Sequence, residues 1–108
     1  MIKPFFVFTL IFFSSCSNIN PKYEYLEKDD SFRKKITTGD FVELSHGFTY
    51  FETNNINSDE IAVFIHGFSV PSYIWDETYY ESIERGLGAI RLDLYGRGNS
   101  SNPDTIYN

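Results

Sequence analysis

The chain has 108 residues, of which 42% are hydrophobic and 19% aromatic, and its formal net charge is −6. This length fits at most one domain, and the apolar content is too high for a chain that is disordered throughout. The acidic balance excludes nucleic acid as an expected partner, because binding phosphates needs clustered Lys and Arg. The longest basic run is only Arg33-Lys34-Lys35. A single cysteine excludes an internal disulfide bond.

The N-terminal segment has the pattern of an export signal. Lys3 gives it a positive charge, and the ten residues that follow, PFFVFTLIFF, are almost wholly apolar. A helix needs about 20 residues to span the hydrocarbon core of a membrane, so this shorter run fits a signal peptide better than a membrane span. We therefore expect residues 1–15 to be a signal peptide and the chain to be exported.

Cys16 follows two serines, and this stretch resembles the lipoprotein signal of bacteria. In that signal an aliphatic residue and two small residues precede a cysteine that is lipidated and becomes the new N-terminus. Ser14, Ser15 and Cys16 match the motif, whereas Phe13 replaces the usual leucine. The resemblance implies a lipid anchor at Cys16, a tether over residues 16–31, and attachment to a membrane on its extracytoplasmic side. An ordinary signal peptide with a chance cysteine is the alternative.

Two short apolar-rich runs, at residues 41–44 and 48–51, flank the dipeptide His46-Gly47. This pattern predicts a β-hairpin in which Gly47 supplies a positive φ. A second turn is predicted at residues 54–58, which are rich in Asn and Ser.

Residues 61–65, IAVFI, are apolar at every position. A strand with one face in water would alternate, so the run predicts a strand covered on both faces, as in a parallel sheet. Residues 89–94 predict a second buried strand. The connection between the two is long enough for a crossover that pairs them in parallel.

A helix is expected over residues 72–85. Ser72 is its predicted N-cap, and Gly86 is suited to the position just after its end. Its predicted apolar stripe consists of side chains spaced four residues apart: Trp75, Tyr79 and Ile83.

The tripeptide His66-Gly67-Phe68 follows the IAVFI run directly. Glycine lets the backbone turn sharply and approach a ligand closely, which would leave the N–H of Phe68 free to donate to a developing oxyanion. In acyl transfer one such donor increases the rate about 10²–10³-fold. The alternative is a plain turn from strand to loop.

The segment DLYGRGNS stands at the exit of the second predicted strand. Asp93 can accept backbone N–H bonds, and Gly96 and Gly98 permit a tight bend. The two glycines also begin a G-x-G-x-x-G pattern, but Ser101 occupies its third position. Because Pro103 keeps a helix from starting promptly, a nucleotide-binding loop is excluded.

Together, the hairpin, the strand ending in His-Gly-Phe, the helix and the strand running into DLYGRGNS resemble the N-terminal part of the α/β-hydrolase fold, among bacterial esterase- and lipase-like enzymes. The resemblance covers residues 32–108. It implies an α/β fold class with an incomplete sheet, made of a β-hairpin followed by a β-α-β unit. It also implies that the IAVFI strand lies centrally, between the second strand and a strand that holds the nucleophile. Without that partner, we expect an open apolar edge and low stability.

The resemblance assigns roles to both loops. Phe68 would give a backbone oxyanion donor, Gly67 would shape that loop, and His66 would be a structural loop residue. The loop at the rim of the active site would be formed by residues of the second segment: Asp93, Gly96, Gly98 and Ser100.

The nucleophile of that family sits in G-x-S-x-G, and its acid and general base follow later in the chain. The nearest approach here runs from Gly98 through Ser100 to Asn102, where the final glycine is missing. Neither His46 nor His66 is expected to be the general base. We therefore expect a fragment of an exported serine hydrolase that is inactive alone.

When complete, this hydrolase is expected to act on a small, ester-like molecule, with no cofactor and no metal. A non-catalytic surface lipoprotein, or the decayed remnant of an enzyme, is the alternative.

Overall fold

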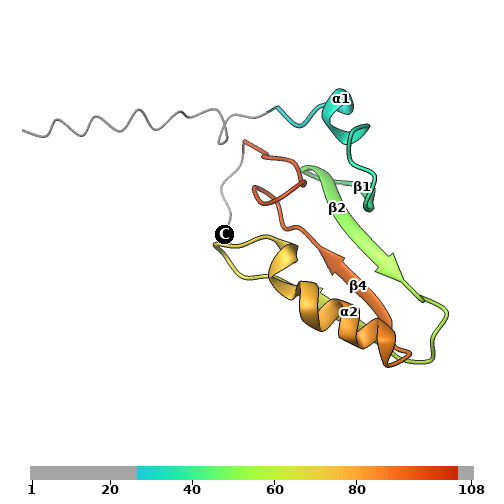
Figure 1. Ribbon diagram of the computed structural model, residues 1–108. Helices are drawn as coiled ribbons and strands as arrows, with labels where there is room; N and C mark the ends of the chain where they lie inside the picture. The colour runs from blue at the N-terminus through green and yellow to red at the C-terminus, as the bar shows by residue number, and fades with distance from the viewer. Residues whose placement is uncertain (1–26, 105–108) are drawn as a thin grey trace, which may run out of the picture.

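The computed structural model describes residues 27–104 (Figure 1). The predicted signal peptide, the predicted lipidation site at Cys16 and most of the predicted tether lie outside the described residues. The elements, in chain order, are α1 (Asp30–Arg33), β1 (Asp40–Leu44), β2 (Gly47–Asn54), β3 (Ile61–Ile65), the 3₁₀ helix η2 (Ser72–Trp75), α2 (Asp76–Glu84) and β4 (Gly88–Leu92).

The four strands form one mixed sheet in the order β1-β2-β4-β3. β2 is antiparallel to both β1 and β4, with Phe51 opposite Leu92, whereas β3 runs parallel to β4 with Val63 beside Ile90. The predicted α/β class, the hairpin and the parallel crossover are thereby confirmed. β4 ends at Leu92, slightly before the predicted limit.

The two predicted turns rest on residues with positive φ. Gly47 opens β2 at a φ of 130°, as expected for a hairpin glycine. Asn55 has a φ of 48°, and its side-chain amide donates to the carbonyl of Gly86 at 3.2 Å. The turn after β2 is therefore attached to the end of α2.

The helical segment starts differently from the prediction. Ser72 is not an N-cap: it is the first residue of η2, the N-cap position is Pro71, and no side chain caps the turn. Instead, the buried N–H of Ser72 donates to Oδ1 of Asp93 at 2.8 Å. A carboxylate from the end of β4 thus satisfies a backbone donor that a local cap would otherwise satisfy.

The end of α2 agrees with the prediction. Gly86 follows the C-cap with a φ of 87°. Its N–H donates to the carbonyl of Ile83 at 2.9 Å, and the next N–H, of Leu87, reaches the carbonyl of Ser82 at 3.1 Å. These two bonds define a Schellman motif, in which glycine avoids the steric strain of the left-handed conformation.

The core lies between α2 and the face of the sheet formed by β3 and β4. Phe64 and Tyr79 meet edge to face with ring centroids 6.0 Å apart, and Ala89 beneath them has no exposed surface. Trp75 and Ile83 pack against this cluster. The predicted apolar stripe of the helix is confirmed.

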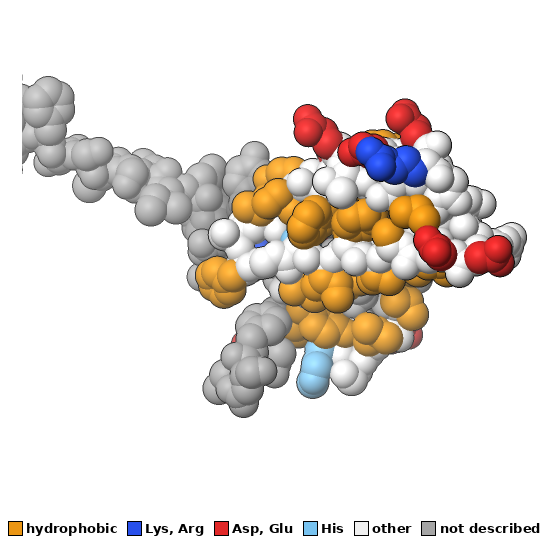
Figure 2. Space-filling view, turned by 90° about the horizontal axis from the view of Figure 1, so that it is seen from below, with side chains coloured by type: hydrophobic (Ala, Val, Ile, Leu, Met, Phe, Trp, Pro, Cys, Tyr) orange, Lys and Arg blue, Asp and Glu red, His pale blue; other side chains and the backbone are white. Residues whose placement is uncertain are grey.

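The opposite face of the sheet has no helix over it within the described residues. Along β3, Ile61, Val63 and Ile65 are 44%, 56% and 57% exposed. Figure 2 shows apolar side chains gathered across the middle of its view, with acidic ones toward the margin. The prediction that β3 is covered on both faces is therefore wrong for the described chain, because α2 reaches only one face.

The start of the described chain packs on the sheet. Asp29 caps α1 by accepting the N–H of Phe32 at 2.9 Å, and the guanidinium carbon of Arg33 lies 3.8 Å from the ring centroid of Phe48. Nζ of Lys28 donates to the carbonyl of Ser100 at 2.5 Å. Of the residues that the sequence assigns to the tether, Lys28 thus contacts the loop after β4, and residues 30 and 31 begin α1.

Replacing Tyr79, which is 2% exposed, tests this account of the core. We expect Tyr79→Ala to lower the free energy of unfolding by about 3 kcal/mol, because it leaves a cavity beside Phe64. The control Tyr73→Ala changes a ring that is 62% exposed and should stay within about 0.5 kcal/mol of the parent. Urea unfolding of the full chain, followed by the fluorescence of Trp75, measures both. Equal effects would contradict the assignment of the core.

Candidate functional site

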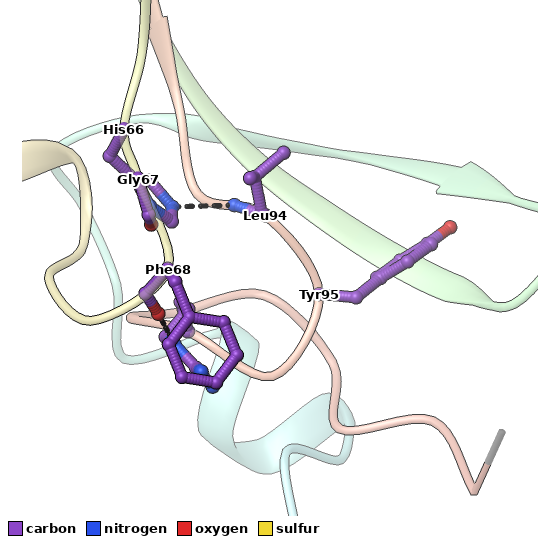
Figure 3. A pocket seen from close by; sticks show the side chains of 6 residues that line it. His66, Gly67, Phe68, Leu94 and Tyr95 are labelled. Atoms are coloured by element: carbon purple, nitrogen blue, oxygen red, sulfur yellow. Dashed lines mark hydrogen bonds between the residues drawn. The ribbon is translucent and has the colours of Figure 1, made fainter. Parts of the chain in front are cut away.

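A pocket of about 310 Å³ opens where β3 and β4 end. Two loops line it, one after each strand: His66, Gly67 and Phe68, and Leu94, Tyr95 and Arg97 (Figure 3). The carboxyl ends of parallel strands lie at one edge of a sheet, where open α/β sheets bind their ligands. The structure thus brings together the two segments that the sequence singled out, although they are separated by the whole of α2.

His66 is buried, with 3% of its surface exposed. Its Nε2 accepts the backbone N–H of Leu94 at 2.8 Å, so the ring proton resides on Nδ1, which lies 2.6 Å from the carbonyl oxygen of Gly67. Both ring nitrogens are occupied within the protein. The imidazole therefore joins the two loops and has no free nitrogen to offer a substrate.

Phe68 exposes 88% of its surface. The guanidinium carbon of Arg97 lies over its ring, 4.7 Å from the ring centroid. Its carbonyl accepts a hydrogen bond from Nε of Arg97. Within residues 27–104, no hydrogen bond uses the N–H of Phe68. Among these residues the N–H has no protein partner, and its role as an oxyanion donor stays a prediction.

The expected role of Gly67 in the approach of a ligand stays a prediction, but its backbone conformation does not require glycine. Its φ is not positive, and a Cβ built there would meet nothing within 4 Å. The turn itself would accept a side chain. Because Gly67 has no side chain, the space beside the pocket stays open at this position. A methyl group would occupy part of that space.

Asp93 holds both loops in place through buried hydrogen bonds. Only 2% of it is exposed. Its Oδ1 accepts the N–H of Ser72, its Oδ2 accepts the N–H of Asn99, both at 2.8 Å, and its own N–H donates to the carbonyl of Tyr50 at 2.9 Å. The carboxylate thus joins the start of the helical segment, the end of β4 and the loop that follows.

Both glycines of this loop adopt positive φ, 73° at Gly96 and 48° at Gly98. At Gly98 the constraint is also steric, because a Cβ would lie 2.0 Å from Oδ2 of Asp93. The carboxylate approaches the backbone at a point that only glycine leaves open.

Ser100 is completely buried. Its hydroxyl donates to the carbonyl of Asp93 and accepts the N–H of Tyr50 at 2.8 Å. The next residue, Ser101, exchanges backbone and side-chain bonds with Phe48, each at 2.9 Å. These serines continue the pairing of β2 beyond the end of β4. The Ser100 hydroxyl is buried and its proton is donated to a backbone carbonyl, so it is not available as a nucleophile.

A charged cluster supports the sheet beside Asp93. Arg91 is 6% exposed and donates to the carboxylates of Asp76 and, at 2.9 Å, Glu52. Burial alone would lower the pKa of Arg91, but these two partners outweigh it and raise the pKa above its ordinary value. Burial also raises the pKa of the neighbouring Tyr50 to about 12, and Glu52 adds to this effect. Sequence reasoning missed Arg91, because it lies within a run read as a buried apolar strand.

Sequence reasoning also left out three residues that line the pocket: Leu94, Tyr95 and Arg97. The available signal was the placement of an arginine between two glycines, at the exit of a strand that points toward a ligand-binding edge. Within the described residues there is no group of three or more His, Cys, Asp or Glu able to hold a metal ion.

The chain matches no protein-family model, and a search of curated proteins finds no relative. Nowhere in residues 27–104 is there a helix of the length and apolarity that crossing a membrane requires. The structure itself establishes the general α/β class and the position of the pocket.

Alanine substitutions at two glycines test the geometry of the pocket loops. Gly98→Ala places a methyl group against Asp93 at positive φ and should lower the free energy of unfolding by at least about 2 kcal/mol. Gly67→Ala should leave it unchanged or raise it by up to about 1 kcal/mol, because ordinary backbone and open space surround it. Chemical denaturation measures the free energy of unfolding of both variants. A Gly98→Ala protein as stable as the parent would refute the close approach of Asp93 to the backbone.

Proposed function

We propose that this chain is the N-terminal part of an exported, lipid-anchored serine hydrolase of the α/β-hydrolase type, esterase- or lipase-like in its chemistry. The observation that supports it best is the pocket at the carboxyl ends of β3 and β4, lined by His66-Gly67-Phe68 and by the DLYGRGNS loop. Two segments that resemble the family in sequence lie together, at the edge where such folds bind substrates.

The proposed role of the first loop is to stabilise charge. When a serine oxygen attacks an ester carbonyl, its proton passes to a histidine and the carbonyl oxygen becomes an oxyanion. The free N–H of Phe68 would donate a hydrogen bond to that oxygen. The C–O bond to the alcohol then breaks, the histidine returns the proton to the leaving alcohol, and water releases the acid from the acyl-enzyme.

The proposal needs groups that these 108 residues do not contain. The sequence has no G-x-S-x-G, Ser100 is fully hydrogen-bonded, and both nitrogens of His66 are occupied. The nucleophile, acid, base and second oxyanion donor would therefore come from outside the sequence printed here. Among the described residues β3 is an edge strand, and this edge and the exposed apolar face beside it leave room for further strands and helices.

The same observations favour a second candidate, a surface lipoprotein without catalytic activity. In that case the buried bonds of His66, Asp93 and Ser100 would serve the fold alone. The two candidates differ in whether the N–H of Phe68 matters for turnover.

An ester assay separates the candidates. The 108-residue chain should give no turnover of a chromogenic short-chain ester above background. The product of the whole reading frame should turn it over if that frame contains G-x-S-x-G. In that product Phe68→Pro, which removes the N–H, should lower kcat about 10²–10³-fold, whereas Phe68→Ala keeps the N–H and most of the activity. Equal activity of the two variants would refute the proposed oxyanion role.

Lipid attachment is tested at Cys16. Expressed in a bacterium that is fed an alkyne-tagged fatty acid, the chain should be labelled and recovered with the membranes. Cys16→Ser should abolish the label, because the acyl groups have no thiol to which they can attach, and Ser17→Ala should retain it. Labelling that persists in Cys16→Ser would exclude the proposed anchor.

A further inference from the structure

Arg97 is the one charged side chain among the described residues that line the pocket. Two of its three guanidinium nitrogens bind loop carbonyls: Nε donates to Phe68, and Nη1 donates to Gly96 at 2.8 Å. Within residues 27–104, no hydrogen bond uses Nη2. The side chain is thus held in place by two contacts, and its third nitrogen has no protein partner among the described residues.

The charge of Arg97 has no carboxylate partner in the described chain. The ion pairs there involve Arg33, Arg85 and Arg91. The carboxylate of Asp93, which belongs to the same loop, is directed at the backbone N–H groups of Ser72 and Asn99. The guanidinium therefore brings to the pocket a positive charge that forms no ion pair within the described residues.

The other walls strengthen this effect. Phe68 and Leu94 contribute apolar side chains, Gly67 has none, and the polar nitrogens of His66 are already bonded. Electrostatic attraction is stronger beside apolar groups than in bulk water, because fewer water dipoles screen it. A ligand that enters this open pocket meets mainly apolar side chains, with the guanidinium of Arg97 among the lining groups.

We propose that Arg97 makes the pocket selective for ligands that combine an apolar body with a carboxylate, which accepts a hydrogen bond from Nη2. The selectivity is a property of the pocket and does not require catalysis. It also deepens the proposed function and rests on it in one respect: if the protein is an esterase, its substrate is an ester that bears a carboxylate on the part seated between the two loops.

The two bonds that hold the loops leave the third nitrogen available for a ligand. Nε and Nη1 suffice to hold the first loop against the second, and the stacking on Phe68 adds to that hold. Binding measurements separate the roles, because a structural link affects every ligand whereas an anion site affects only charged ones.

The experiment compares two probes of the same shape, 3-phenylpropionate and its neutral amide, 3-phenylpropionamide. Their affinities for the full chain are measured by NMR titration at about 0.15 M salt, where long-range attraction is screened. We expect the carboxylate to bind about tenfold more tightly than the amide, the difference that one charge-assisted hydrogen bond gives. The amide signals of residues 66–68 and 94–97 should shift.

Three variants make the result specific. Arg97→Gln should remove the preference for the carboxylate while leaving the affinity for the amide within about twofold. Arg97→Lys keeps the charge without the planar fork, and should keep part of the preference even if Arg97→Gln disturbs the loop. Arg85→Gln, at the C-cap of α2, is the matched control and should behave as the parent does; the Arg85 side chain is 72% exposed.

Equal binding of the two probes by the parent chain would overturn the proposal. So would an Arg97→Gln protein that loses both probes equally, since that result assigns Arg97 a structural role only. A preference that survives in Arg97→Gln and Arg97→Lys alike would place the anion elsewhere. These outcomes are independent of the ester assay, because the probes are not hydrolysed and the chain needs no nucleophile to bind them.

Discussion

The arrangement of both pocket loops depends on one buried carboxylate. Asp93 accepts the N–H groups of Ser72 and Asn99, and so joins the beginning of the helical segment to the loop after β4. A buried charge is stable only where hydrogen bonds replace the lost water, and here backbone donors of two segments supply them. Asp93 also constrains the next residues of the loop. Its carboxylate lies against the backbone of Gly98, and its carbonyl accepts the hydroxyl of Ser100.

The sequence predicted the elements better than their contacts. The hairpin, the IAVFI strand, the stripe of α2 and its terminal glycine follow from periodicity and from backbone preferences, which are local properties. The start of the helix did not follow, because Ser72 is satisfied by a residue distant in the sequence. Arg91 was missed for a related reason: its partners Glu52 and Asp76 come from two other elements, and only the fold brings them together.

For the candidate site, too, the sequence predicted the position better than the contacts. The sequence identified the two segments that line the pocket, and it predicted that neither histidine would be a general base. It did not show that both nitrogens of His66 are occupied, nor that Arg97 would lie against Phe68 with one nitrogen free. At Gly67 the backbone conformation is ordinary and a Cβ would meet open space, which the sequence alone could not show.

The way in which Ser100 and Ser101 attach to β2 has a consequence for the order of folding. Their bonds to Tyr50 and Phe48 join residues 50 and 53 positions apart, whereas the hairpin of β1 and β2 closes through neighbours in the chain. Contacts of high sequence separation close the largest loops, and so form at the greatest entropic disadvantage. The loop that contributes Leu94, Tyr95 and Arg97 to the pocket is therefore anchored, at its far end, by contacts of high sequence separation. A nascent chain would have its hairpin and helix before it had a place to bind a ligand.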